Sequence, residues 1–225
     1  MIKICVSGSS GKMGSRIVEL AKEDTDLRVC GAFDAIEENP EQFIESTECL
    51  IEFTTPQATM EHLALCEKHK KAMVIGTTGL SDAEKDKVEA AAKNIPVVFS
   101  PNMSIGVNLL FKLVRDAAKV LGQDYNIEIV EAHHIHKKDA PSGTAKEIAR
   151  VIKESRGDAD VPIESVREGE TVGEHTVTFE SNVDMIEITH SAKTRDIFVK
   201  GALQAAKFVA GKKNGLYSMK EVLGL

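Results

Sequence analysis

The chain has 225 residues, 42% of them apolar, which suits one large domain or two small ones with a hydrophobic core. A formal net charge of −7 and a pI near 5.6 exclude a general nucleic-acid surface, which would need a basic face. Every apolar run is shorter than the roughly eighteen residues that a membrane-spanning helix needs, so we expect no membrane partner.

The first hundred residues alternate between buried strands and helices. Apolar runs predict strands at 2–7, 27–33, 48–53, 72–76 and 96–100. Helices are predicted between them, from Lys12 to Lys22, from Pro56, and from the capping box that Ser81 forms with Glu84. Short connections between alternating strands and helices predict a parallel sheet with helices on both faces, a Rossmann-type α/β domain.

The pattern changes after residue 104. A predicted helix at 106–121 precedes segments of two-residue alternation, typical of antiparallel strands with one covered face, at 126–134, 174–181 and 184–192. Helical spacing returns at 201–211. We expect a dinucleotide-binding domain from residues 1–104 and 193–225, and a smaller α+β domain with a mainly antiparallel sheet from residues 105–192. The four cysteines form no C-x-x-C pair, which favours free thiols in a reducing cytoplasm.

Residues 8–14, GSSGKMG, follow the first strand and open the first helix. Such glycines allow a tight turn and close backbone approach to a pyrophosphate at the helix N-terminus, and Asp34 after the second strand can accept from ribose hydroxyls. A tight turn without a ligand is the alternative. Asp34 would repel a 2′-phosphate, and Ala35 rather than an arginine follows it. We therefore expect NADH as the preferred cofactor, with NADPH also used and Lys12 as a nearby cation.

Two further loops follow strands of the predicted sheet. They are Gly76–Thr77–Thr78–Gly79 and Ser100–Pro101–Asn102–Met103. Open parallel sheets bind ligands at the carboxyl ends of their strands, so both loops are candidates for cofactor contact. Ordinary connecting loops remain the alternative.

Residues 131–145, EAHHIHKKDAPSGTA, gather three histidines and two lysines. In an extended strand His133 and His134 point to opposite sides, which makes a three-histidine metal site awkward, so we predict no metal. Thr144 and Glu147 predict a capping box and a helix start there. Helix N–H groups, ammonium and imidazole together predict a carboxylate pocket, with histidine available as a proton donor. A solvated basic loop is the alternative.

These residues resemble a known family. EAHHIHKKDAPSGTA is similar to the signature E-A-H-H-x-x-K-x-D-A-P-S-G-T-A of the 4-hydroxy-tetrahydrodipicolinate (dihydrodipicolinate) reductase family. The resemblance covers nearly the whole chain, because other family blocks are similar to GSSGKMG, VIGTTG, SPNMSIGVN, VGEHTVTF, IEITHSA and GLYSMKEVLGL. The chain is short for the family, with few residues between Asp34 and the strand at 48–53.

The resemblance implies NAD(P)H-dependent reduction of this dicarboxylate to tetrahydrodipicolinate in lysine and diaminopimelate biosynthesis. It implies that His133 donates the proton and that Lys137 assists it electrostatically. Substrate would be bound by His134, Ser142, Gly143 and Thr144, with Lys138 close by. The implied cofactor-binding residues are Gly8, Ser9, Ser10, Gly11, Lys12, Met13, Asp34, Gly76, Thr77, Thr78, Ser100, Pro101, Asn102 and Met103. A homotetramer formed through sheets of the second domain is also implied.

Three other functions fit parts of the sequence. A different dinucleotide-dependent dehydrogenase would share the first domain. A non-catalytic NAD-sensing protein would bind the cofactor without oxidising it. A metal-dependent hydrolase would use the histidines as ligands.

Overall fold

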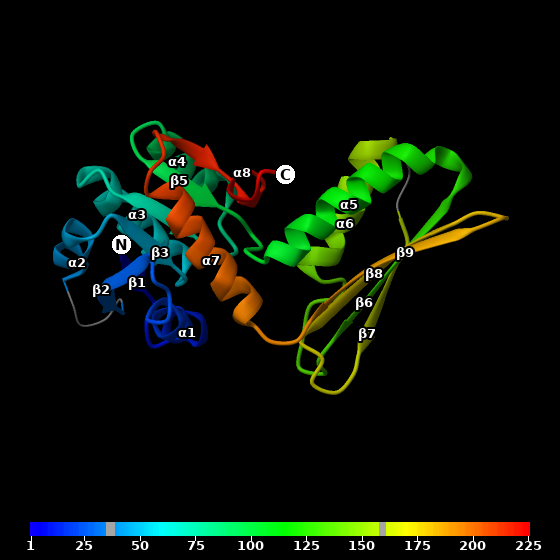
Figure 1. The fold of residues 1–225 in the computed structure, drawn as a ribbon, viewed down its shortest axis with the longest axis horizontal. Helices are drawn as coiled ribbons and strands as arrows, with labels where there is room; N and C mark the ends of the chain where they lie inside the picture. Colours follow the sequence, from blue (N-terminus) through cyan, green and yellow to red (C-terminus); the bar gives the residue numbers. More distant parts are fainter. Residues whose placement is uncertain (35–38, 158–160) are drawn as a thin grey trace. The chain divides into compact units, whose positions relative to one another are not determined.

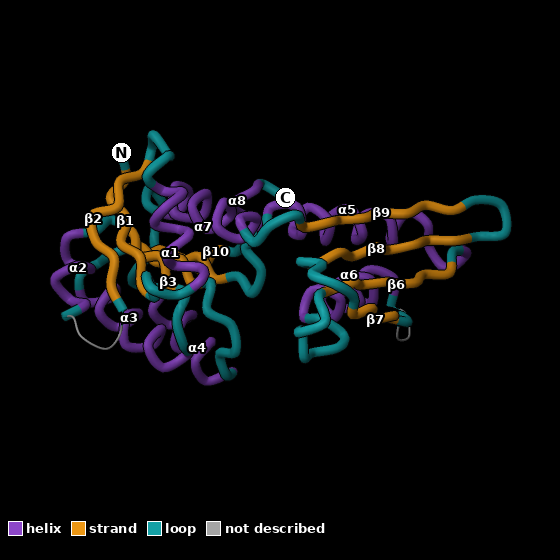
Figure 2. The backbone as a smooth tube through the Cα atoms, turned by 90° about the horizontal axis from the view of Figure 1, so that it is seen from below, coloured by secondary structure: helices purple, strands orange, loops and turns teal. Residues whose placement is uncertain are grey.

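The computed structural model describes residues 1–34, 39–157 and 161–225. They form two compact units, residues 1–105 with 198–225, and residues 106–197. Each unit has its own sheet (Figures 1 and 2). Within the described residues, no helix is long and apolar enough to cross a membrane.

The first unit is a three-layer sandwich around a fully parallel sheet, in the order β10-β5-β4-β3-β1-β2. The strands are β1 Ile2–Ser7, β2 Leu27–Phe33, β3 Cys49–Glu52, β4 Ala72–Ile75, β5 Pro96–Phe99 and β10 Gly215–Tyr217. The helices are α1 Lys12–Ala21, α2 Pro40–Ser46, α3 Pro56–Lys68, α4 Asp82–Ala92, α7 Asp196–Val209 and α8 Met219–Leu223. This arrangement confirms the predicted Rossmann-type α/β fold.

Alternation along the strands distributes the helices over the two faces. In β3, Ile51 packs in a core with side chains of α1, α7 and α8, whereas Leu50 packs in a second core with α2, α3 and α4. Successive strand residues point to opposite faces, so each short buried strand serves both layers. The predicted caps are present: the Thr55 side chain caps α3, and Ser81 forms a capping box with Glu84 at the start of α4.

The second unit packs two helices on one face of a four-stranded mixed sheet, in the order β7-β6-β8-β9. Its elements are α5 Ile105–Leu121, a 3₁₀ turn at Gly122–Asp124, β6 Asn126–His133, α6 Gly143–Arg156, β7 Ile163–Arg167, β8 Gly173–Glu180 and β9 Met185–Ala192. Among the described strands of this sheet, only the β6–β7 pair is parallel. The predicted mainly antiparallel sheet is thus confirmed.

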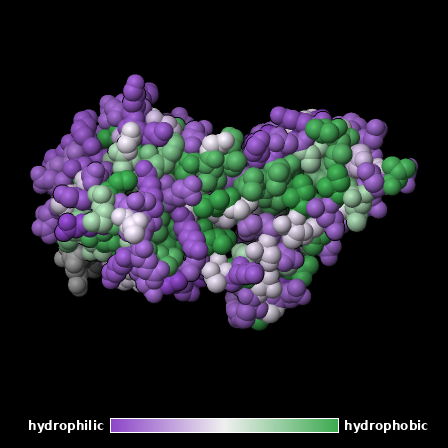
Figure 3. Space-filling view, in the orientation of Figure 1, coloured by the Kyte–Doolittle hydropathy of each residue, from purple (hydrophilic) through white to green (hydrophobic). Residues whose placement is uncertain are grey.

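The hairpin that joins β8 to β9 exposes apolar side chains at its tip. Val183, between β8 and β9, is 91% exposed, and Met185 is also exposed. This hairpin tip is the hydrophobic surface at the right-hand edge of Figure 3.

Two predicted helix starts are wrong. The helix predicted at 201–211 is α7, which begins earlier, at Asp196. Ser142, not Thr144, is the N-cap of α6, because its side chain accepts from the Ala145 backbone N–H at 3.1 Å. Thr144 lies inside the first turn. The sequence prediction also missed α2, β7, β10 and α8, which are short and carry weak periodicity.

Candidate active site

The glycine-rich loop joins β1 to α1. Gly8 has φ +79°, a left-handed conformation that a side chain disfavours, and a Cβ there would come within 2.6 Å of the Phe53 carbonyl oxygen. A Cβ on Gly14 would overlap the Gly8 carbonyl oxygen. The first turn of α1 therefore lies directly on the loop, and the N-terminal N–H groups of the helix are brought to a narrow glycine-lined turn suited to a phosphate.

Asp34, at the end of β2, is bound to this loop. Its Oδ2 atom accepts from Ser9 Oγ at 3.0 Å, from Ser10 N at 2.9 Å, and also from Ser10 Oγ. Burial raises the pKa of Asp34, but hydrogen bonds from Ser10 and Ser9 outweigh it, so the pKa lies below its usual value. Asp34 is therefore ionised at neutral pH, as recognition of ribose hydroxyls requires.

The loops that follow β4 and β5 begin at the same edge of the sheet, because these strands are parallel neighbours. Thr77 Oγ1 accepts from Thr54 N at 3.1 Å and from the Thr59 hydroxyl at 2.9 Å, so Thr77 is locked in place. Ser100 Oγ donates to the Asn102 carbonyl oxygen at 2.9 Å.

The other residues of these two loops differ in what they can offer a ligand. The Met103 side chain is buried in the core, so it could meet a cofactor only through its backbone. Thr78 and Pro101 are exposed, and Lys12 is exposed at the start of α1.

A buried polar pair beneath these loops escaped the sequence analysis. Glu52, at the end of β3, is fully buried and accepts from His62 Nδ1 of α3 at 2.6 Å. Ser7 Oγ lies 3.3 Å from the same nitrogen. The available signal was an acid at the end of the otherwise apolar strand ECLIEF. These residues connect the ends of β1 and β3 to α3, below the predicted nucleotide loops.

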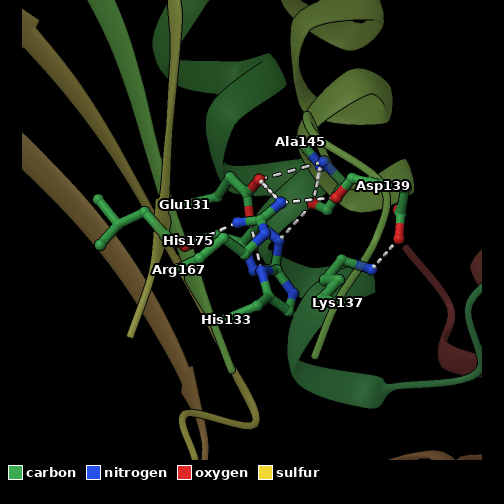
Figure 4. A network of polar contacts seen from close by, with 9 residues as sticks. Glu131, His133, Lys137, Asp139, Ala145, Arg167 and His175 are labelled. Carbon is green, nitrogen blue, oxygen red and sulfur yellow. Dashed lines mark hydrogen bonds and ion pairs between the residues drawn. The ribbon is translucent and has the colours of Figure 1, made fainter. Parts of the chain in front are cut away.

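In the second unit, three ionisable residues share the helix-covered face of the sheet. Glu131 and His133 are two residues apart on β6, so their side chains point to the same face. Glu131 is paired with His175 of β8 in the antiparallel register. All three are buried. The same face carries the apolar core further along, including Ile129 and Val177. One face of one sheet therefore provides the hydrophobic core and, at its end, the polar site that is drawn in Figure 4.

Glu131 is the centre of this polar site. One of its oxygens, Oε1, accepts from Arg167 Nη2 at 2.8 Å and from Ser142 N at 3.2 Å, while Oε2 pairs with His133 Nδ1. Burial raises the pKa of Glu131, but the Arg167 hydrogen bond and the attraction of His133 outweigh it, bringing the pKa to about 2. Glu131 is therefore a buried carboxylate that remains ionised.

The imidazole rings of His133 and His175 pack edge to face, with their centroids 5.2 Å apart. Burial lowers the pKa of His175 to about 4, so this ring is neutral near pH 7, and its Nε2 lies 3.2 Å from Ser142 Oγ. Burial also lowers the pKa of His133; Glu131 opposes this, while Lys137 and Arg167 add to it. His175 is a site residue that the sequence analysis missed, because only strand pairing brings it beside His133.

The loop between β6 and α6 adds the cations. Lys137 Nζ pairs with Asp139 at 2.9 Å, and Arg167 Nη2 donates to the Asp139 carbonyl oxygen at 2.6 Å. Figure 4 shows Lys137 on the loop beside His133. The structure thus gathers the predicted catalytic residues His133 and Lys137 near the start of α6, where the predicted substrate-binding residues Ser142, Gly143 and Thr144 form the N-cap and first turn.

His134 follows β6 and lies apart from this network, with its ring 6.0 Å from that of His136. Its Nδ1 is buried and lacks a hydrogen-bond partner among the described residues. Lys138 lies on the same loop.

Glu131, His133 and His175 also meet the spacing of a metal site, since their ligand atoms lie within 4.8 Å of one another. The surrounding charges oppose a cation there. Glu131 is already paired with Arg167, and Lys137 adds a second positive charge that acts on His133. The set is better suited to an anion than to a divalent metal.

A parallel sheet with a glycine loop before its first helix and an acid after its second strand defines a class, the dinucleotide-dependent oxidoreductases. Family models narrow this class. Residues 2–103 match the model described as dihydrodipicolinate reductase, N-terminus, and residues 106–223 match dihydrodipicolinate reductase, C-terminus. The chain belongs to the dihydrodipicolinate reductase family, as its motifs predicted.

Curated relatives agree with this assignment. The chain is 41% identical to 4-hydroxy-tetrahydrodipicolinate reductase from Geobacter metallireducens and 37% identical to that from Syntrophotalea carbinolica, and each match covers 100% of both chains. These alignments extend over 265 and 266 positions, against 225 residues here, so the chain is short for the family, as predicted.

Solved structures show the same fold. A dipicolinate-bound dihydrodipicolinate reductase from Paenisporosarcina sp. TG-14 matches with a TM-score of 0.87 and 25% identity over 98% of each chain. A probable dehydrogenase from Thermotoga maritima matches with a TM-score of 0.67 over 99% of this chain and 93% of its own, at 13% identity, which supports the fold alone.

Proposed function

We propose that this chain reduces 4-hydroxy-tetrahydrodipicolinate with NADH or NADPH, yielding tetrahydrodipicolinate for lysine and diaminopimelate biosynthesis. The observation that carries the proposal is the buried pair of Glu131 and His133, set beside Lys137, Arg167 and the N-terminus of α6. Positive charge and N–H donors suit a dicarboxylate, and the imidazole suits proton transfer. Relatives that match the whole chain carry the name of this activity.

The nicotinamide cofactor would be held by the glycine loop and the two strand-end loops of the first unit. The turn from Gly8 to Met13 would hold the pyrophosphate at the N-terminus of α1, and Asp34 would accept from the adenosine ribose. Residues 76–78 and 100–103 would line the rest of the site. We propose a preference for NADH, because an ionised Asp34 repels a 2′-phosphate. The neighbouring position in that reasoning, Ala35, lies outside the described residues.

The substrate would be held in the second unit. The N–H groups at Ser142–Gly143–Thr144 and the side chain of His134 would bind a carboxylate, with Lys138 nearby. Lys137 would stabilise negative charge as it develops on the ring, and His133 would supply the proton. Dipicolinate, which the Paenisporosarcina reductase binds, has the same pair of carboxylates.

The cofactor supplies a hydride when bound, and the chain supplies placement and charge. Excluding water around His133 strengthens each of these electrostatic interactions, since the site is already largely buried. Lys137 would lower the barrier as electron density moves onto the substrate, because its positive charge acts at His133.

The proposal includes a homotetramer in a reducing cytoplasm. All four cysteines are free thiols. One face of the second sheet is covered by α5 and α6, whereas Met185 of β9, on the opposite face, is exposed. An uncovered sheet face of this kind is suited to pairing with a second copy.

The test is oxidation of reduced nicotinamide with substrate formed in situ from pyruvate and aspartate semialdehyde by the preceding synthase. NADH and NADPH are assayed in parallel. Rapid oxidation, faster with NADH, is expected. Tight NADH binding without oxidation would instead favour an NAD-sensing protein. Oxidation of the cofactor with another amino-acid precursor would favour a different dehydrogenase. Stoichiometric zinc that is lost in His133→Ala would favour a metal-dependent hydrolase.

A further inference from the structure

The two nitrogens of His133 lie in different surroundings. Nδ1 pairs with the carboxylate of Glu131, two residues back on the same face of β6. Nε2 lies over Gly173, at the start of β8, where a Cβ would come within 3.0 Å of it. One edge of the ring is therefore fixed, and the other is kept clear.

The carboxylate settles which nitrogen carries the proton in the neutral ring. An ionised carboxylate only accepts hydrogen bonds, and Glu131 already takes two on its other oxygen, from Arg167 Nη2 and Ser142 N. The partner of Oε2 must be a donor, so neutral His133 carries its hydrogen on Nδ1. Nε2 is then the nitrogen that gains and releases a proton.

Gly173 has no backbone reason to be glycine. Its φ is not in the left-handed region, unlike that of several other described glycines, and it pairs with Ala192 of β9 in the regular antiparallel register. What it provides is room, because a Cβ would also lie 3.3 Å from Cδ2 of His133. His175 packs edge to face against the same ring and limits its rotation.

We propose that Glu131, held by Arg167, is the positioning residue that fixes His133 in the Nδ1–H tautomer and directs proton donation through Nε2, and that Gly173 keeps that nitrogen open to the substrate. This rests on the proposed function, because it assigns an orientation to the proposed proton donor. Glu131 and Arg167 act through His133 and do not contact the substrate.

The charges around His133 give the proposal a signed pH dependence. Glu131 lies on its own strand, Lys137 and Asp139 on the following loop, Arg167 on β7 and the neutral His175 on β8. A proton donor loses activity as the pH rises above its pKa. Removing the negative charge of Glu131 lowers that pKa, whereas removing the positive charge of Arg167 raises it.

The experiment compares kcat/KM against pH for wild type, Glu131→Gln and Arg167→Gln, with NADH affinity measured separately. Glu131→Gln should lower kcat at least about tenfold, a smaller loss than the roughly 10²–10⁴ that the general acid itself contributes. Its alkaline limb should move down by about one pH unit, and that of Arg167→Gln should move up. Glu164→Gln, an exposed acid on β7, is the matched control with wild-type behaviour expected.

Gly173→Ala supplies an arm that leaves every charge in place. It should lower kcat several-fold with an unmoved pH limb and unchanged NADH affinity, whereas Gly211→Ala, with open space around its Cβ, should change nothing. If Glu131→Gln fails to fold, Arg167→Gln and Gly173→Ala still decide.

Wild type that oxidises no cofactor would refute the proposed function itself. If the wild type is active but the alkaline limbs of Glu131→Gln and Arg167→Gln stay fixed or move in the same direction, the positioning role alone is overturned.

Discussion

Replacing Glu131 with glutamine should change how the second unit responds to acid. The pKa of Glu131 is about 2 in the folded chain, against an ordinary value of 4.5. A difference of that size corresponds to about 3 kcal/mol of stability above the unfolded pKa. Because the folded pKa is the lower one, this stabilisation is complete at neutral pH and is lost as the pH falls from about 4.5 through about 2. At pH 3 only about 1.4 kcal/mol of it remains.

The assay can report on the second unit alone. The chain has no tryptophan and two tyrosines, Tyr125 in the second unit and Tyr217 in the first. In a Tyr217→Phe background, tyrosine fluorescence during urea unfolding follows Tyr125. The unfolding free energies measured in this background with and without the Glu131→Gln substitution should differ most at pH 7 and converge toward pH 3. A gap that stays constant over this range would show that Glu131 does not titrate at an unusually low pH.

Other predictions concern activity and cofactor binding. Lys137→Ala and His133→Ala should each lower kcat by about 10²-fold or more without weakening NADH binding, because both residues act on the substrate. A loss of NADH affinity in binding titrations would contradict this. Gly14→Ala should weaken NADH binding and lower the Tm, since its Cβ would overlap the Gly8 carbonyl oxygen; an unchanged melting curve would argue against that close packing. Asp34→Asn should raise the ratio of NADPH to NADH turnover, and an unchanged ratio would mean that this carboxylate does not face the ribose.

The strand and helix order of the first unit could be predicted because its signals are local. Short apolar runs, Thr55 before Pro56, and the Ser81–Glu84 box each specify one boundary without knowledge of the rest of the chain. The misplaced start of α6 shows the limit. Thr144 and Glu147 have the spacing of a capping box, but Ser142 caps the helix because its backbone N–H is also bound by Glu131.

The candidate site could be predicted only where its residues lie close together in the sequence. His133 and Lys137 belong to one motif, whereas Arg167 and His175 reach Glu131 through strand pairing across 36 and 44 positions of the chain. A lone histidine in an alternating strand carries no sign of its neighbour. The pairing register, and with it the placement of Arg167 and His175 around Glu131, is a property of the folded sheet.

The first unit is discontinuous, and this has a consequence for the order in which a growing chain can fold. Helix α7 supplies buried side chains to one face of its sheet, and β10 adds the edge strand beside β5. Both leave the ribosome after most of the second unit, because they follow it along the chain. The second unit, residues 106–197, is contiguous and complete before them. During synthesis, the amino-terminal strands must therefore wait with one apolar face covered by α1 alone, while the later-made unit can already fold, the reverse of the usual order.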